Sequence, residues 1–98
     1  MKTKLLNINA IINAAQKVTG KSSKAIKSPT RLASVVAARN LCYKIAKEQL
    51  FLADRDIAVS FNRDRSAVTY SLKRVEQDLD QQENYRVMLS LINKELGL

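Results

Sequence analysis

Apolar residues recur at helical spacing along most of the chain, and polar or turn-forming residues separate the segments. The predicted helices span about residues 8–19, 29–50, 55–61, 64–79 and 83–97. Asn7 or Asn9 can cap the first helix, and Gly20 can end it. The polar stretch before Pro29 is expected to be a connector, because the residue before a proline disfavours helix.

Each long segment is expected to have an apolar face. On the long central helix this face comprises Leu32, Val35, Ala38, Cys42, Ile45 and Gln49, widened by Val36, Leu41 and Ala46. Three basic residues lie on or near its other faces: Arg31, Arg39 and Lys47. The last two helices carry inner stripes of Val68, Leu72, Val75 and Leu79, and of Tyr85, Leu89, Ile92 and Leu96. These stripes are too short for stable isolated coiled coils, so packing within one bundle is favoured over a coiled coil.

The composition favours an all-α protein. The 98 residues include two Gly and one Pro, which leaves few positions for strand turns, and helix-forming residues dominate. A hydrophobic content of 46% suffices for one core, so residues 1–98 are expected to form a compact single-domain helical bundle of about five helices. No apolar run approaches 18 residues and no signal-peptide pattern is present, which makes the cytoplasm, with the nucleoid, the expected location.

The residues from Ile57 to Val75 indicate a helix-turn-helix. A short helix, with Asp54 as its expected N-cap, leads into a tight turn at residues 62–64. The next helix begins with charged and hydroxyl side chains, which can place several hydrogen-bond donors in the major groove of DNA. Double-stranded DNA is therefore the leading candidate partner. The helix-turn-helix is expected at about residues 54–79 and the C-terminal helix at about 83–97.

Basic residues are concentrated in the same part of the chain. Residues 1–75 contain 15 Lys and Arg against 4 Asp and Glu, whereas residues 76–98 contain 2 against 5, within a total net charge of +8. A basic body with a weakly acidic end favours one surface that meets a polyanion and another that faces away from it. A basic surface that only aids solubility is the alternative interpretation.

Four short motifs lie between Arg31 and Glu76. They are Arg39-Asn-Leu-Cys-Tyr-Lys-Ile-Ala-Lys-Glu-Gln-Leu50, Ile57-Ala-Val-Ser-Phe61, Asn62-Arg-Asp-Arg-Ser-Ala-Val68 and Lys73-Arg-Val-Glu76. Together they resemble the C-terminal DNA-binding domain of the bacterial replication initiator DnaA, and this resemblance implies a Trp-repressor-like helix-turn-helix. Three departures stand out: Asn62 replaces two glycines of the turn, Arg65 replaces the signature His, and Ala67 replaces a second hydroxyl. The preferred DNA sequence is therefore expected to differ from the family's usual initiator box.

The resemblance also implies which side chains read bases. Asp64, Arg65 and Ser66 correspond to major-groove readers, and Arg39 corresponds to an arginine that reaches the adjacent minor groove. From residue chemistry alone, Arg65 favours guanine, whereas Asp64 could accept from a cytosine or act only as an N-cap. Tyr70 could stack on a sugar or pack against the protein. Further basic and hydroxyl side chains are candidate DNA contacts, mainly to phosphate: Arg31, Lys44, Lys47, Arg63, Thr69 and Lys73.

Catalysis is not expected of this chain. It has no Gly-x-x-x-x-Gly-Lys-Ser/Thr motif for an ATPase, and its acidic pairs, Asp54 with Asp56 and Asp78 with Asp80, are expected on exposed caps and turns. The absence of His argues against a zinc site, and Cys42 on an apolar stripe is expected to be buried and unreactive. No metal or other cofactor is therefore predicted.

The predicted function is sequence-preferring binding of double-stranded DNA, in the regulation of replication or transcription and without an ATPase of its own. Two alternatives stay open at this point. The chain could be a protein-interaction module that binds a partner, such as a replication protein, through residues 85–98. It could also bind RNA through the same basic face.

Overall fold

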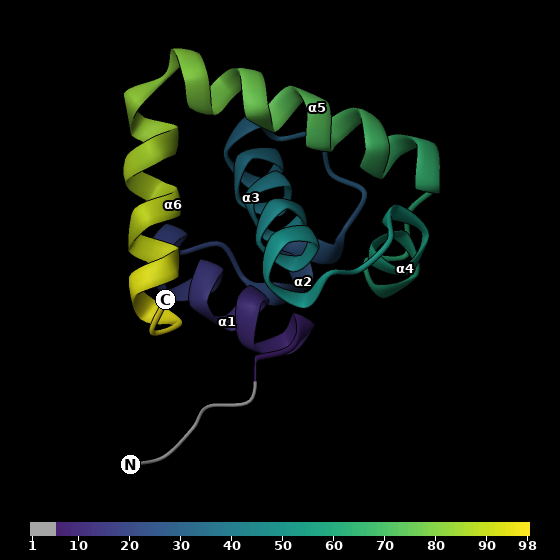
Figure 1. The fold of residues 1–98 in the computed structure, drawn as a ribbon, viewed down its shortest axis with the longest axis horizontal. Helices are drawn as coiled ribbons and strands as arrows, with labels where there is room; N and C mark the ends of the chain where they lie inside the picture. Colours follow the sequence, from purple (N-terminus) through teal and green to yellow (C-terminus); the bar gives the residue numbers. More distant parts are fainter. Residues whose placement is uncertain (1–5) are drawn as a thin grey trace.

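The computed structural model describes residues 6–98, which form six α-helices and no strand (Figure 1). The helices are α1 (Ile8–Thr19), α2 (Ser23–Lys27), α3 (Ala33–Leu50), α4 (Asp54–Ser60), α5 (Arg65–Gln81) and α6 (Glu83–Glu95). Helix α3 contacts α1, α2, α4 and α5, and α6 packs on α1 and α5. The all-α prediction is confirmed, with one helix more than expected. None of the described helices is long and apolar enough to cross a membrane.

Helix α2 is the element that the sequence pattern did not predict. The hydroxyl of Ser22 caps its start by accepting a backbone hydrogen bond at 3.1 Å, and Ile26 is fully buried. Five residues are too few to show a repeat of apolar positions, so the segment resembled a polar connector. Helix α1, by contrast, begins and ends as predicted, with a cap from Asn7 at 2.8 Å and with Gly20 at φ 75°.

Helix α3 begins at Ala33, later than the predicted start at Pro29. Ten of its eighteen residues are buried, because four other helices contact it. Leu32 and Gln49, which were assigned to the apolar face, are exposed, whereas Arg39, which was assigned elsewhere, is buried. Leu32 is the N-cap and so lies outside the helix, whereas Arg39 is buried because a helix contacted on several sides has no single apolar face.

Helices α5 and α6 follow their predicted stripes. In α5, which crosses above α3 in Figure 1, Val68 and Val75 are fully buried, and Ile92 is the fully buried residue of α6. The remaining stripe residues are partly exposed and pack against the core: Leu72, Leu79, Tyr85, Leu89 and Leu96. Asp78 was expected on an exposed turn but is buried, because α5 continues to Gln81 and α6 folds back beside it.

Candidate nucleic-acid interface

Helices α4 and α5 are joined by a four-residue turn, from Phe61 to Asp64. Asn62 lies in the left-handed region at φ 54°, a conformation that Asn tolerates better than most residues. The backbone N–H of Arg63 donates to the carbonyl of Ala58 at 2.8 Å, which closes the turn. A single Asn therefore suffices at this position, and α5 starts immediately after the turn.

The turn is anchored to α3 through an aromatic pair. The ring of Phe61 is fully buried and meets the ring of Tyr43 edge-on, with centroids 4.9 Å apart and planes at 90°. Both rings lie in the core cluster that also contains Ile57 of α4 and Val68 of α5. The position of the α4–α5 pair relative to the rest of the protein is therefore set by core packing, which makes it a rigid element.

The first turns of α5 carry the exposed polar side chains that the sequence predicted there. Arg65, Ser66 and Lys73 are exposed, and neither Arg65 nor Lys73 forms a salt bridge with another described residue. Asp64 occupies the N-cap position, as one interpretation expected, but its side chain makes no capping hydrogen bond. Its carboxylate is exposed at the start of the helix and is available to a ligand.

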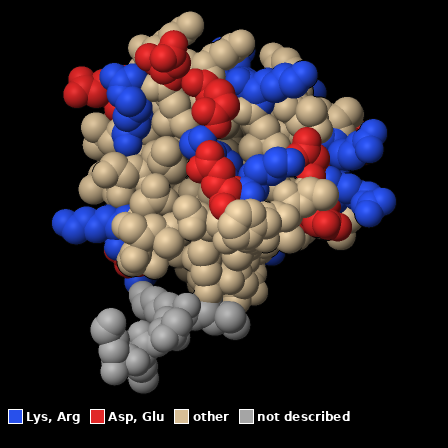
Figure 2. All heavy atoms as spheres, viewed as in Figure 1, with Lys and Arg blue, Asp and Glu red and all other residues tan. Residues whose placement is uncertain are grey.

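A hollow of about 710 Å³ lies between the start of α4 and this face of α5. Its polar lining consists of Asp54, Arg55, Arg65, Ser66, Thr69, Tyr70 and Lys73. Arg55 is exposed and was not among the predicted site residues. Its position, one residue after the expected N-cap of the first helix of a helix-turn-helix, was the signal that could have identified it. In Figure 2, basic side chains gather on the side where α4 and the start of α5 lie, with acidic ones among them.

Two of the predicted phosphate-binding lysines are held by carboxylates. The ammonium of Lys44 donates to Glu48 at 2.7 Å and to Glu76 of α5, and only 11% of its side chain is exposed. Burial alone would lower the pKa of Lys44, but the hydrogen bonds to Glu48 and Glu76 raise it. Lys47 donates to Asp54 at 2.6 Å. The charge of each lysine is thus offset by a neighbouring carboxylate, which weakens its attraction for a phosphate.

Thr69 is likewise engaged within the protein. Its hydroxyl donates to the second carboxylate oxygen of Asp54 at 2.6 Å. Asp54 was expected to cap α4, but it is the first residue of that helix and makes no capping bond. Its carboxylate instead bridges α3 and α5.

Arg39 does not lie where the sequence prediction placed it. Its residue is 3% exposed, and its guanidinium donates to the carbonyls of Ile26 at 2.8 Å, Ser28 at 2.6 Å and Thr30 at 3.0 Å. In this structure Arg39 is buried and its Nε and Nη2 donate to backbone carbonyls, so it is not exposed as the predicted contact with the minor groove would require. Burial lowers the pKa of Arg39, and the nearby charge of Arg63 lowers it further.

Arg63 and Arg31 differ from Arg39 in exposure. Arg63 is partly buried, and its Nη1 is enclosed with no hydrogen-bond partner among the described residues. It therefore lies partly against the interior of the turn, close enough to Arg39 to affect its pKa. Arg31 is exposed and forms no salt bridge with another described residue. It follows the segment whose carbonyls Arg39 binds.

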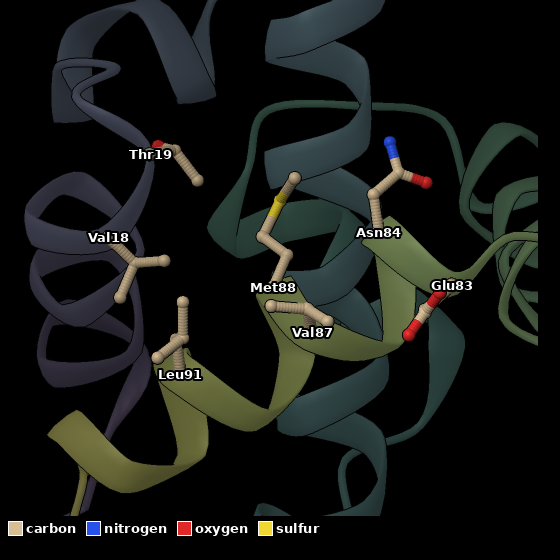
Figure 3. Close-up of a pocket in the computed structure, with 7 residues that line it drawn as sticks. All are labelled: Val18, Thr19, Glu83, Asn84, Val87, Met88 and Leu91. Carbon is tan, nitrogen blue, oxygen red and sulfur yellow. The ribbon is translucent and has the colours of Figure 1, made fainter.

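A second hollow, of about 410 Å³, lies between α1 and α6 (Figure 3). Val87, Met88 and Leu91 of α6 face Val18 of α1 across it. Val87 is 50% exposed and Leu91 is 47% exposed. This hollow is apolar, shares no lining residue with the one between α4 and α5, and belongs to the part of the molecule with the acidic C-terminal segment.

Comparison with known proteins agrees with this geometry. A family model described as the bacterial dnaA protein helix-turn-helix matches residues 8–75. The chain is 34% identical over 90 residues to the chromosomal replication initiator protein DnaA of Thermotoga petrophila. The aligned residues cover 92% of this chain and 20% of that relative. A protein of the same name from Thermotoga sp. strain RQ2 is 36% identical over 72 residues, which covers 74% of this chain and 16% of the relative.

The chain thus spans about a fifth or less of the length of these relatives. The matched residues include α1 to α4, the turn and the part of α5 that carries the exposed basic and hydroxyl side chains. The chain belongs to the family of bacterial DnaA helix-turn-helix domains.

Proposed function

We propose that this chain binds double-stranded DNA with a sequence preference, by placing the start of α5 in the major groove. The observation that carries the proposal is the exposed first turn of α5, where Arg65 has no salt-bridge partner among the described residues. The opposite side of the same helix is held in the core by Val68 and Val75. Membership of a helix-turn-helix family supports DNA binding.

Three side chains are the proposed base readers. Arg65 can donate two hydrogen bonds to O6 and N7 of a guanine, and Asp64 can accept from the amino group of a cytosine. Ser66 can donate to, or accept from, either kind of base edge. Thr69 is better suited to a supporting role, because its hydroxyl already donates to Asp54.

Phosphate contacts are proposed for the exposed basic side chains around this helix. Arg55 and Lys73 line the same hollow as Arg65, so they flank the proposed base readers. Arg31 is the exposed arginine next to the segment that Arg39 binds, and we assign the outward DNA contact of this segment to Arg31. Lys44 and Lys47 contribute less, since each is paired with a carboxylate.

A role in the regulation of replication or transcription follows from this binding mode. The two relatives are named as chromosomal replication initiators, and this chain matches a fifth or less of each. A chain that occupies initiator-like sites would compete with, or mark sites for, a full-length initiator. This role needs no nucleotide hydrolysis by the residues of this chain, and it places the protein on the nucleoid.

Selection of bound duplexes from a random pool tests the proposal. We expect an enriched sequence with a guanine at the position that Arg65 contacts. Arg65→Ala should lose about 1–3 kcal/mol of binding free energy on that duplex and should relax the preference at that base pair. Lys94→Ala, at an exposed position in the last turn of α6, is the matched control and should change neither quantity.

Four results would contradict the proposal. Equal losses on selected and random duplexes for Arg65→Ala would reject base reading. Tighter binding of a structured RNA than of the duplex, weakened by the same substitution, would favour RNA as the ligand. Failure to enrich any duplex would reject a sequence preference, and failure to bind any duplex at low salt would reject DNA binding altogether.

A second candidate function is contact with a replication protein through residues 85–98. The observation that favours it is the half-exposed pair Val87 and Leu91 beside the apolar hollow, because contiguous exposed apolar surface often marks a protein contact. Leu91→Asp should abolish such a complex between purified proteins and leave duplex affinity unchanged. Loss of duplex affinity in this variant would reject a separate protein contact.

A further inference from the structure

The carboxylate of Asp54 connects three helices. Asp54 is the first residue of α4, its Oδ1 accepts from Lys47 of α3 at 2.6 Å, and its Oδ2 accepts from Thr69 of α5 at 2.6 Å. Only 21% of the Asp54 side chain is exposed, compared with 46% for Lys47. Each carboxylate oxygen thus has one short, charge-assisted or hydroxyl hydrogen bond to a different helix.

The bond to Thr69 acts on the orientation of α5. Thr69 lies one helical turn after Arg65 and one turn before Lys73, so the three residues share a face of the helix. A hydrogen bond from Thr69 to α4 therefore restrains the rotation of α5 about its own axis. Hydrogen bonding to a base edge depends on a donor position that is held within roughly 0.5 Å. Fixing this rotation sets the direction in which the Arg65 side chain leaves the helix.

The bond to Lys47 has a different consequence. A lysine without a carboxylate partner can neutralise a DNA phosphate, which adds affinity that does not depend on sequence. The ammonium of Lys47 donates to the carboxylate of Asp54 at 2.6 Å, so its positive charge is already offset by a neighbouring negative charge that repels a phosphate. The pair therefore lowers the sequence-independent part of the affinity for DNA, which is the same for every duplex.

We propose that Asp54 is a specificity-determining positioning residue, which orients the base-reading face of α5 through Thr69 and keeps Lys47 from phosphates. This inference rests on the proposed DNA-binding function. It assigns the discrimination between duplexes partly to a residue that touches no base.

Three variants separate the two effects, each measured on the selected duplex and on a scrambled duplex over a range of salt concentrations. Asp54→Asn removes the charge but keeps an acceptor for Thr69, so it should steepen the log–log salt slope by about 0.9, the value for one added phosphate contact. Thr69→Val keeps the Lys47 pair, so it should lower the ratio of the two affinities about tenfold and leave the slope unchanged. Asp54→Ala should show both changes.

Asp56→Ala is the matched control, because Asp56 is also acidic and in the first turn of α4 but forms no salt bridge with another described residue. It should change neither the slope nor the ratio. The inference is overturned if Asp54→Ala behaves like Asp56→Ala, or if folded Thr69→Val keeps the wild-type ratio. If the wild-type protein itself does not distinguish the two duplexes, the proposed function fails, which is a separate result.

Discussion

Arg39 is a buried charged residue whose hydrogen bonds all go to the protein backbone among the described residues. Its guanidinium binds the carbonyls of Ile26, Ser28 and Thr30, so one side chain links positions up to 13 residues before it in the chain. These carbonyls lie in the segment that precedes α3, where helix hydrogen bonds cannot reach them. The segment that leads to Arg31 is thereby held in place.

Replacing Arg39 should therefore reduce stability first and DNA binding only as a consequence. We expect Arg39→Ala to lower the free energy of unfolding by about 1.5–3 kcal/mol, because hydrogen bonds from a charged donor to buried acceptors are lost. Urea unfolding followed by circular dichroism measures this. Arg31→Ala is the control and should leave stability within about 0.5 kcal/mol, as expected for an exposed side chain. Unchanged stability in Arg39→Ala, with weaker DNA binding, would instead make Arg39 a direct contact.

Phe51 ends α3 in a conformation that suits glycine better than phenylalanine. Its φ is 56° and it is 87% exposed, so it combines a left-handed backbone with little burial. The left-handed conformation costs a residue with a Cβ about 1–2 kcal/mol of stability. Glycine avoids this steric cost, but its greater conformational freedom in the unfolded chain offsets part of the gain. Phe51→Gly should raise the free energy of unfolding by about 0.5–1 kcal/mol. Phe51→Ala keeps the Cβ and should not raise the free energy of unfolding. If Phe51→Ala also stabilises the protein, the effect comes from loss of the exposed ring and not from the backbone conformation.

Cys42 is expected to report on unfolding. The residue is fully buried, and burial raises the pKa of its thiol to about 12. The thiolate is the reactive form, so about a thousandfold less of it is present near neutral pH than for a free cysteine with a pKa near 9. Labelling by iodoacetamide should therefore be negligible in the native protein and should rise with urea in parallel with the loss of helix. Complete labelling within minutes in native buffer would show that the core around α3 opens.

At the scale of helices, how well the sequence predicted a helix and its buried residues depended on how many sides of it pack against other helices. Helices α1, α5 and α6 each bury one face, so the spacing of apolar residues such as Val68 and Val75 located them correctly. Helix α3 is contacted by four helices, and its buried residues include Arg39 and Asn40, which no hydrophobic pattern would place inside. Helix α2 is too short to show a period at all.

The candidate site likewise has one part that the sequence could predict and one part that it could not. The exposed start of α5 could be predicted, because turn chemistry and helical spacing are local properties. Glu48, four residues after Lys44 on the same helix, could also be predicted as its partner. The pairs of Lys44 with Glu76, Lys47 with Asp54 and Thr69 with Asp54 could not, since their members are 32, 7 and 15 residues apart and meet only in the folded protein. A basic residue therefore marks a candidate phosphate contact in the sequence, and only the fold shows whether its charge is available.

The link between α3, α4 and α5 should also be visible in the pH dependence of stability. Hydrogen bonds from Lys47 and Thr69 hold the pKa of Asp54 below its ordinary value of 3.8. Because the folded pKa is lower than the unfolded one, Asp54 stabilises the protein above about pH 4 and loses that contribution as the pH falls. The loss of stability between pH 6 and pH 3 should be smaller in Asp54→Asn than in the wild type, by urea unfolding at each pH. Asp56→Asn should keep the wild-type difference, and equal differences in all three proteins would contradict the role of this carboxylate.

At the scale of the whole molecule, the basic part and the acidic part of the chain lie toward different ends. The structure measures 39 × 29 × 23 Å, with α4 and the start of α5 at one end of the view in Figure 1 and α6 at the other. Residues 76–98, which include α6, carry 2 basic and 5 acidic residues, so this part is net negative and the rest of the chain carries more than the total net charge of +8. A polyanion is attracted to one end of such a molecule and orients it before contact.

Matched charge reversals test whether this separation matters more than net charge. Lys73→Glu and Lys94→Glu each change the net charge by the same amount, and both lysines are exposed and form no salt bridge with another described residue. Lys73 lines the hollow beside Arg65, whereas Lys94 lies in the last turn of α6. We expect Lys73→Glu to weaken duplex binding and to flatten the log–log salt slope by about 0.9, and Lys94→Glu to leave the slope unchanged. Similar effects of the two variants would mean that the chain attracts DNA as a diffuse positive charge, and that the α4–α5 face has no special part in binding.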